Sequence, residues 1–445
     1  MNFFSILEKR LMPLAELVGK NKYLIAIRDG FLISTPLLII GSFFILIANF
    51  PIPGWADFWI SIFGVNWENY LMRPVAATFD IMAVFAVMGI GYSFARQMNV
   101  NAIFGAAVSL VGFFTLMEFK IPFNHVDLTS TVNVSGIYLK WVGSSGIFLG
   151  MISAFLAVHI YAWVLKRGWI IKMPEGVPPT VTQSFAALIP VGVVMLAFFL
   201  INIVLSVINL GNAFNLVFNV LQTPLVSAGG SLLAMVIAYL FLHLFWFFGI
   251  NGSAVVGAVY NPILRVLTLE NLDAFKAGEQ LPHIITGAFQ DMFATFGGGG
   301  STLSLLIAMF IFCRSQRIRS LGKLSFIPGL FGINEPIIFG LPIVLNPILL
   351  IPFILVPTFN IITTYFVMQV GLVPYTNGVM LPWTTPVVIS GFLSTDWRGA
   401  VWQIILLVIG VFMYAPFIKM LDKQYLKDEK NVKIEEKISF DDVKL

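Results

Sequence analysis

Long runs of apolar side chains follow one another from Phe31 to Leu421, and this feature restricts the fold most. Several runs are about 20 residues long, which is the length an α-helix needs to cross a membrane. Hydrophobic residues make up 58% of the chain and charged residues only 11%, too apolar for a water-soluble protein. A transmembrane β-barrel would show short alternating segments instead. The sequence therefore predicts an all-α polytopic membrane protein with about ten transmembrane helices.

The apolar runs change character along the chain. The early runs are long and continuous, and we expect spans at residues 31–50, 75–95, 102–118, 146–165, 185–210 and 231–248. Beyond Gly249 the runs are shorter and are interrupted by Gly, Pro and Asn; the piece at 254–267 is too short to span. Interrupted pieces at membrane depth are typical of re-entrant or broken helices beside a cavity. We therefore expect residues 31–210 to form a transmembrane scaffold and residues 211–421 to form the substrate-binding transport half.

Lys and Arg side chains predict the orientation, because cytoplasmic loops carry an excess of them. They gather at Lys9–Arg28, at Arg96, at Lys166–Lys172, at Arg314–Lys323 and in the last residues. The loop at residues 51–68 has none, so we expect both termini to be cytoplasmic. Residues 1–30 are expected to form an amphipathic segment at the cytoplasmic interface. Residues 422–445, with seven acidic and six basic side chains, are expected to be a charged, disordered cytoplasmic tail.

Residue types that support metal, disulfide or nucleotide chemistry are scarce. The chain has one cysteine, Cys313, and four widely separated histidines, which excludes a disulfide framework and a Cys/His metal site. We interpret Cys313 as a packed small hydrophobe. Gly297–Gly300 lacks the Gly-Lys-Ser/Thr of a nucleotide-binding loop, and we interpret it as a hinge or a place where a ligand approaches the backbone. We expect no metal, no cofactor and no nucleic acid partner; the pI near 9.0 reflects cytoplasmic anchoring charge.

Glu335 is the most informative single residue of the chain. A carboxylate in an apolar stretch costs on the order of 3 kcal/mol to insert, so it usually faces a cavity or a partner. Asn334 and Pro336 flank it in a broken segment, and Phe331–Asn334 repeats the sequence of Phe248–Asn251. Paired interrupted segments indicate a transporter binding site, although four matching residues also arise by chance. The alternative for Glu335 is an interfacial side chain at the end of a loop.

Two tryptophans with polar neighbours form a second pattern. Sugar sites stack aromatic faces on pyranose C–H surfaces and use amides and hydroxyls to bond the sugar hydroxyls. The residues that fit this pattern are Trp246, Asn251, Asn334, Asn377, Trp383 and Thr384. The alternative is an interfacial aromatic belt. Together with Glu335, these residues are the predicted substrate site.

The chain resembles a known family in several stretches that cover nearly all of it short of the charged tail. The stretches are Ile27–Gly30, Met173–Pro179, Ser184–Pro190, Trp246–Gly252, Gly332–Pro342 and Pro382–Thr384. They are similar to enzyme IIC, the membrane permease of the bacterial sugar phosphotransferase system, in its lactose/cellobiose/chitobiose branch. The Asn-Glu-Pro motif is the most specific of them.

The resemblance implies a bacterial plasma-membrane permease with ten transmembrane helices, an N-terminal dimerisation half and re-entrant hairpins that hold a disaccharide. It implies that the sugar moves inward and that the phosphocysteine of a IIB protein, itself supplied by IIA, phosphorylates its 6-hydroxyl. Glu335 matches the carboxylate that contacts this hydroxyl, and Trp246 and Trp383 match aromatics that contact the sugar. Some members have His where this chain has Asn251. Asn cannot shuttle a proton near pH 7, which leaves Glu335 as the nearby titratable group.

The resemblance also predicts partners. No segment suited to hold the phosphocysteine is found in the sequence, so we expect IIB to be a separate chain. This favours a permease for cellobiose, chitobiose or a related β-glucoside or β-mannoside, and the sequence does not choose among them. The basic residues expected to meet phosphorylated IIB are Lys166, Arg167, Lys172, Arg314, Arg317 and Arg319. Gly143–Gly146 and Gly150 let helices approach closely and favour a homodimer.

A second class of transporter fits the same residues. A proton-coupled sugar symporter could use Glu335 as its proton site, because one buried carboxylate suits both mechanisms. Only the resemblance favours group translocation over symport. A structural membrane protein without a substrate fits poorly with broken segments that carry Asn and Trp. Membrane phosphotransfer, with the donor cysteine on IIB, is therefore the expected activity.

Overall fold

Helices make up most of the described chain. The computed structural model describes residue 13 and residues 17–50, 52–123, 132–208, 210–341, 343 and 346–442. Residues 1–12 and 14–16 of the expected amphipathic segment lie outside the described residues. Its expected end at residue 30 is wrong, because the long apolar helix α2 (Lys22–Ala48) already begins at Lys22. Two short strands, β1 (Lys120–Phe123) and β2 (Val132–Ser135), pair antiparallel with Ile121 opposite Val134.

The chain divides into two compact units. The N-unit comprises Glu16–Gly229 and Gly257–Glu270, and the C-unit comprises Met1–Ala15, Gly230–Val256 and Asn271–Leu445. One long helix, α13 (Gly252–Ala277), gives its middle to the N-unit and its two ends to the C-unit. The substrate-site residues predicted from the sequence belong to the C-unit.

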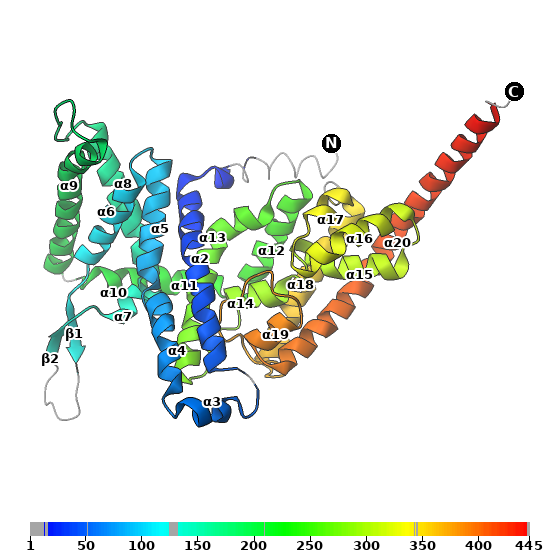
Figure 1. Ribbon diagram of the computed structural model, residues 1–445, viewed down its shortest axis with the longest axis horizontal. Coiled ribbons are helices and arrows are strands. Elements are labelled where there is room, and N and C mark those ends of the chain that lie inside the picture. The colour runs from blue at the N-terminus through cyan, green and yellow to red at the C-terminus, as the bar shows by residue number, and fades with distance from the viewer. Residues whose placement is uncertain are drawn as a thin grey trace. The chain divides into compact units, whose positions relative to one another are not determined.

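The N-unit is a helical bundle with a hairpin (Figure 1). Its helices are α2 (Lys22–Ala48), α3 (Trp55–Phe63), α4 (Trp67–Val75), the π-helix η1 (Ala76–Asp80), α5 (Met82–Gln97), α6 (Ala102–Thr115), α7 (Leu139–Val142), the 3-10 helix η2 (Ser144–Gly146), α8 (Ile147–Lys166), α9 (Pro179–Val207), α10 (Ala213–Val217), the π-helix η3 (Phe218–Gln222) and α11 (Thr223–Gly229). Helix α5 packs against α2, α6 and α8. A Cβ on Gly30 would lie 2.5 Å from Ile90, so small residues allow α2 and α5 to approach closely.

The C-unit is built from helices that are repeatedly broken. They are α12 (Leu232–Phe247), α14 (Gly287–Phe289), the π-helix η4 (Gln290–Ala294), the 3-10 helix η5 (Gly299–Ser301), α15 (Thr302–Phe312), α16 (Gln316–Leu330), α17 (Glu335–Gly340), α18 (Pro347–Gln369), α19 (Ile389–Ser394) and α20 (Trp397–Asp442). Helix α20 packs against α15, α18 and α19, and α12 packs against α18. The breaks at Gly297–Gly300 and at Phe331–Asn334 confirm the broken helices expected in this half.

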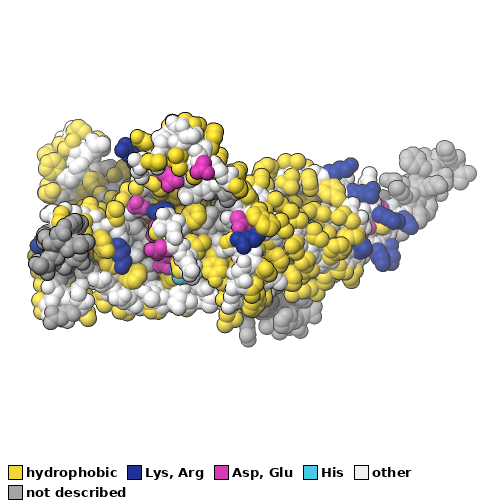
Figure 2. Space-filling view, turned by 90° about the horizontal axis from the view of Figure 1, so that it is seen from below, with side chains coloured by type: hydrophobic (Ala, Val, Ile, Leu, Met, Phe, Trp, Pro, Cys, Tyr) yellow, Lys and Arg dark blue, Asp and Glu magenta, His cyan; other side chains and the backbone are white. Residues whose placement is uncertain are grey.

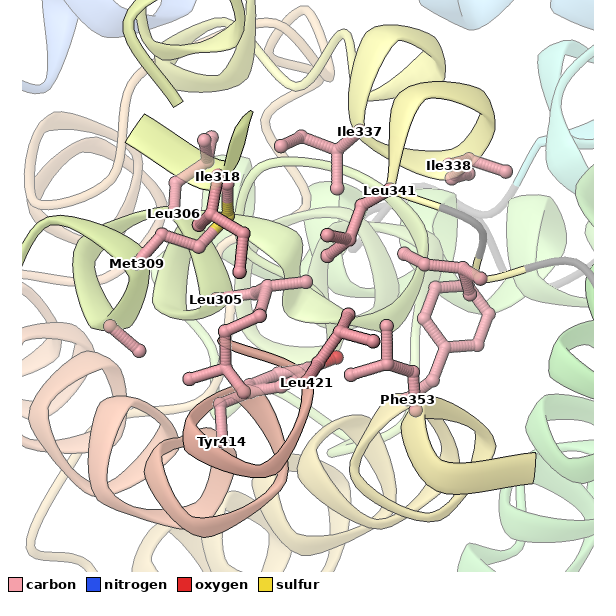
Figure 3. Close-up of a cluster of buried hydrophobic side chains, with 14 of the residues drawn as sticks. Leu305, Leu306, Met309, Ile318, Ile337, Ile338, Leu341, Phe353, Tyr414 and Leu421 are labelled. Carbon is pink, nitrogen blue, oxygen red and sulfur yellow. The ribbon is translucent and has the colours of Figure 1, made fainter. Parts of the chain in front are cut away.

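A hydrophobic core positions the short helix α17 within the C-unit. Figure 3 shows Ile337, Ile338 and Leu341 meeting side chains of α15, α18 and α20. Ile337 and Ile338 are fully buried, so close packing against neighbouring helices holds this face of α17. Because this face is anchored, the start of α17, where Glu335 lies, has a fixed place.

The membrane class predicted from the sequence is confirmed. Within the described residues, seven helices are long and apolar enough to span, and two bent pairs raise the number to nine if each pair is one span. Helix α6 is a further apolar helix of 14 residues. Figure 2 shows hydrophobic side chains over much of the visible face, with charged side chains in separate groups. The chain is therefore a multi-pass α-helical membrane protein.

Two expectations about segment boundaries are wrong. The piece at residues 254–267 is not short, because α13 continues to Ala277. The charge that interrupts this apolar piece, Arg265, has partners within the protein. Its Nη2 donates to Thr35 Oγ1 at 3.1 Å, and its guanidinium lies 5.7 Å from the ring centroid of Phe31.

The tail at residues 422–442 is helical, not disordered, because it is the continuation of α20. Asp422, Tyr425 and Glu429 share one face of this helix, and each contacts the start of α16. Asp422 accepts hydrogen bonds from the backbone N–H groups of Arg314 and Ser315. These contacts give a charged segment a partner that its composition did not indicate.

Candidate functional site

Two turns of the same geometry stand before α13 and α17. In the first, Gly249 has φ 77° and the Ile250 N–H donates to the Phe245 carbonyl at 3.0 Å. In the second, Gly332 has φ 82° and the Ile333 N–H donates to the Pro328 carbonyl at 3.0 Å. This is the Schellman ending of a helix, in which a left-handed glycine follows the last turn. The repeated sequence therefore encodes the same structure twice.

The two turns use their asparagines differently. Asn251 is exposed, and its Oδ1 accepts from the Ala254 N–H at 2.9 Å, which caps α13. Asn334 is 4% exposed and does not cap α17 with its side chain. Its Nδ2 donates instead to the Gly299 carbonyl at 2.9 Å and to Thr302 Oγ1 at 3.1 Å. Asn334 thus fastens the turn before Glu335 to the four-glycine segment.

The four-glycine segment Gly297–Gly300 brings Trp246 to the same place. A Cβ on Gly298 would lie 2.6 Å from Asn334 Cγ, so only a glycine fits there. A Cβ on Gly299 would lie 3.5 Å from Trp246 Nε1. Trp246 is 8% exposed, and its Nε1 donates to Ser253 Oγ at 3.3 Å. The segment therefore lies between the indole of Trp246 and the amide of Asn334.

Trp383 covers the turn before Glu335 from another direction. A Cβ on Gly332 would lie 3.0 Å from Trp383 Cζ3 and 3.1 Å from Cε3. The indole therefore packs directly on the glycine backbone, and it remains 61% exposed. An exposed aromatic face held by backbone contact can stack on a ligand at little entropic cost. Thr384 follows it and is half-buried.

Glu335 is the first residue of α17 and is exposed, next to buried Asn334. Among the described residues, no side-chain hydrogen bond or ion pair to its carboxylate is found. A carboxylate free of internal partners can accept hydrogen bonds from a polar ligand and can take a proton. Glu335 lies three residues after Gly332, on which the indole of Trp383 packs. An exposed acid and an exposed aromatic face therefore lie at the same turn.

Asn377 takes a different position from the other predicted site residues. Its Nδ2 donates to the Leu393 carbonyl at 3.0 Å, and its Oδ1 accepts from the Val379 N–H at 3.0 Å. One end of the amide is therefore bound to α19 and the other to the loop that carries Trp383. Direct contact with a substrate stays a prediction for Asn377, as it does for every other predicted site residue.

The basic residues expected to meet a partner lie in two places, one in each unit. Lys166, Arg167 and Lys172 are exposed at and after the end of α8. Arg314 and Arg317 are exposed at the start of α16, and the Arg317 guanidinium lies 4.3 Å from the ring centroid of Tyr425.

Cys313, the residue before Arg314, is 1% exposed and fits its interpretation as a packed hydrophobe. Burial, followed by the nearby Asp422 carboxylate, raises the pKa of its thiol to about 12. The thiol is therefore protonated at neutral pH and is a poor nucleophile.

Sequence reasoning missed two buried residues that hold the four-glycine segment. His243 of α12 accepts a hydrogen bond from the Gly300 N–H at 2.9 Å, and the Tyr414 hydroxyl of α20 donates to the Gly300 carbonyl. An ionisable side chain inside an apolar run is a functional candidate by default, and His243 lies three residues before Trp246. That signal could have singled out His243, whereas nothing in the sequence marks Tyr414 among many aromatics.

The broken helices of this membrane protein meet at a turn that has the exposed indole of Trp383 and the exposed carboxylate of Glu335. These features are typical of a transporter for a polar solute. Comparison with known proteins makes the class specific, because residues 28–357 match the family "Phosphotransferase system, EIIC". The chain belongs to this family, as its resemblance in sequence predicted.

Known relatives cover almost the whole chain. The cellobiose-specific EIIC component of the phosphotransferase system of Geobacillus stearothermophilus is 41% identical over 96% of each chain. The lactose-specific EIICB component of Staphylococcus epidermidis is 32% identical over 96% of this chain and 73% of its own length. The crystal structure of the transporter ChbC, the IIC component of an N,N'-diacetylchitobiose-specific system, superposes with a TM-score of 0.93 at 42% identity, over 96% of this chain and 99% of that one.

Proposed function

We propose that the chain carries a β-linked disaccharide across the membrane and presents it for phosphorylation by a IIB protein. The observation that carries the proposal is the meeting of Trp246, Asn334 and Trp383 around the turn that bears the free carboxylate of Glu335. Three relatives support the sugar class, because their names state specificity for cellobiose, lactose and N,N'-diacetylchitobiose. Each of these sugars is a β-linked disaccharide.

The chemistry assigned to the site is the transfer of a phosphoryl group to a primary hydroxyl. The hydroxyl oxygen attacks phosphorus, an O–P bond forms, the P–S bond to the IIB cysteine breaks, and the thiolate leaves with IIB. Glu335 accepts a hydrogen bond from the hydroxyl, orients it and takes its proton as it attacks. The exposed face of Trp383 stacks on the sugar ring, and Trp246 contacts the sugar from the buried side.

The partner in this account is a separate phosphorylated IIB protein, charged by IIA, that approaches from the cytoplasm. The cellobiose relative is named as an EIIC component and is matched over 96% of its length, whereas the EIICB relative is matched over 73%. The exposed cations Lys166, Arg167 and Lys172, with Arg314 and Arg317, attract its phosphoryl group. Both termini lie in the cytoplasm in this account, with residues 422–445 as the charged cytoplasmic segment.

The account includes a homodimer formed through the N-terminal half, residues 31–210. The small residues that suggested a dimer contact include Gly150, which packs within its own unit. A Cβ on Gly150 would lie 2.6 Å from Val87. Helix α9 leaves most of its apolar side chains uncovered, since its buried residues are Ala187, Pro190, Val194 and Phe198. We therefore place the dimer contact on α9. Cross-linking from α9 in native membranes should give dimers, and recovery of monomer alone would remove this element.

The competing symporter differs in its product. Family membership does not favour symport, and a reconstitution experiment separates the two mechanisms. Vesicles with the purified protein should form sugar phosphate only when phosphorylated IIB is present on the cytoplasmic side. Accumulation of unmodified sugar, driven by a proton gradient without IIB, would contradict the proposal. Binding of cellobiose, N,N'-diacetylchitobiose, lactose and β-mannobiose to the purified protein would identify the sugar.

A further inference from the structure

The four-glycine segment and the serine after it have an unusual backbone. Gly297, Gly298, Gly300 and Ser301 have φ values of 72°, 91°, 77° and 55°. A residue with a side chain, such as Ser301, is strained in this left-handed region. Glycines also gain conformational freedom when they are released. Such a segment keeps one conformation only if the surrounding structure holds it.

Gly300 is held on both of its backbone polar groups by side chains from two helices. His243 Nε2 of α12 accepts from its N–H at 2.9 Å, and the Tyr414 hydroxyl of α20 donates to its carbonyl. Both side chains are fully buried. The third neighbour is Phe353 of α18, since a Cβ on Gly300 would lie 2.1 Å from its ring. Three helices thus fix the position of one glycine.

The hydrogen bonds also fix the form of His243. Its Nδ1 lies 2.7 Å from the Tyr239 carbonyl, which can only accept, so Nδ1 carries the proton. Its Nε2 accepts from Gly300, so that nitrogen carries a lone pair. The ring is therefore the neutral tautomer with hydrogen on Nδ1. In the other tautomer, and in the protonated ring, Nε2 carries a hydrogen. It would then face the Gly300 N–H, which is also a donor.

The position of Gly300 determines where the neighbouring site residues lie. The neighbouring Gly299 carbonyl receives the Asn334 amide, and Asn334 precedes Glu335. The Gly299 α-carbon faces Trp246, which lies one helical turn after His243 on α12. A displacement of Gly300 would therefore move the anchor of Asn334 and the backbone beneath the Trp246 indole together.

We propose that His243 and Tyr414 are positioning residues for sugar phosphorylation, acting through Gly300 on Asn334, Glu335 and Trp246. They touch neither sugar nor phosphoryl group. The inference rests on the proposed site and adds two residues outside the predicted set. Because a misplacement of about 1 Å can reduce a rate ~100-fold, their loss slows transfer more than it weakens binding.

The test compares His243→Phe with His243→Gln. Phe keeps the bulk of the ring and removes the acceptor, whereas the Gln amide oxygen can reach the Gly300 N–H. Single-turnover transfer from phosphorylated IIB should slow by about 10- to 100-fold in His243→Phe, with a change in sugar Kd of less than about 5-fold, and His243→Gln should recover most of the rate. Tyr414→Phe should slow transfer in the same way. His159→Gln, in the N-unit, is the control and should behave as the native protein.

A Gln variant as slow as the Phe variant, or a Phe variant as fast as the native protein, would overturn the inference. Glu335→Gln, measured in parallel, separates it from the proposed function. If Glu335→Gln is inactive while His243→Phe and Tyr414→Phe are native-like, only the positioning role fails; if Glu335→Gln is fully active, the proposed site fails.

A second measurement does not depend on the variants being active. Nitrogen-15 spectra of histidine-labelled native protein should contain an unprotonated Nε2 signal that His243→Gln removes. A protonated Nε2 at His243 would also overturn the inference.

Discussion

Asn251 and Asn334 stand at the same position in two turns of the same geometry, but their side chains bind different groups. Asn251 caps the helix that follows it, α13, by accepting from the Ala254 N–H. Asn334 reaches across to the Gly299 carbonyl of the four-glycine segment. One asparagine therefore stabilises its own helix, and the other links two broken segments beside Glu335.

Truncation to alanine should mainly lower stability at Asn251 and mainly slow phosphorylation at Asn334. Asn251→Ala should lower the free energy of unfolding by about 1 kcal/mol through the lost cap. Any sugar contact that it removes should affect sugar binding, so the single-turnover rate at saturating sugar should stay almost unchanged. Asn334→Ala should slow phosphorylation by about 10- to 100-fold, because the turn before Glu335 loses its anchor. Thermal unfolding and single-turnover transfer measure the two effects. The same rate loss in both variants would contradict the division of roles.

Gly332→Ala tests whether Trp383 depends on the glycine beneath it. The added Cβ would lie 3.0 Å from the indole, so the ring must move. We expect sugar binding to weaken about 10-fold, which corresponds to about 1.4 kcal/mol. Gly371→Ala is the matched control, because Gly371 has a similar φ of 78° and nothing within 4 Å of its Cβ position. Both variants share a backbone cost of about 1–2 kcal/mol, and equal binding by both would count against the prediction.

Asp422→Ala should loosen the start of α16. Asp422 is 5% exposed and accepts from the N–H groups of Arg314 and Ser315 at 3.0 and 2.9 Å. Leaving these donors buried without a partner costs about 1–3 kcal/mol locally. Hydrogen exchange at the two amides should accelerate in the Ala variant and much less in Asp422→Asn, which keeps an acceptor. Unchanged exchange in Asp422→Ala would show that Asp422 does not hold the start of α16.

Neutralising the exposed cations should affect the encounter with IIB and not the sugar. Replacing Arg314 and Arg317 with Gln should raise the KM for phosphorylated IIB by about 10-fold at low salt, since exposed charges mainly steer association. The same change at Lys166, Arg167 and Lys172 tests the other basic group. The sugar Kd should stay constant, and Arg73→Gln serves as the control. A parallel loss of sugar binding would identify the cations as structural.

The sequence alone was sufficient to predict that the chain is a membrane protein and that its helices are broken near the site. Apolar runs show where helices lie in lipid, and Gly, Pro and Asn show where they stop, as at Gly297–Gly300. It was insufficient for α13, because the charge of Arg265 interrupts the apolar pattern and only the folded structure supplies Thr35 and Phe31 as its partners.

The two positioning residues, His243 and Tyr414, also could not be predicted from the sequence. His243 and Tyr414 are 171 residues apart in chain number, and they are brought together only because each bonds to the backbone of Gly300. Side chains that act through a third residue leave no local motif. In contrast, Glu335 was found because a carboxylate in an apolar stretch is costly wherever the chain folds.

The most direct test of the account is single-turnover phosphorylation by Glu335→Gln, with sugar binding measured on the same protein. Gln keeps the shape and one acceptor but removes the charge and the base. We predict that transfer from phosphorylated IIB falls at least ~100-fold, while binding weakens by about 1.5–3 kcal/mol through the lost charged hydrogen bond. Glu335→Asp should also fail, because its carboxylate retreats by about 1 Å. Transfer at a near-native rate in Glu335→Gln would contradict the account.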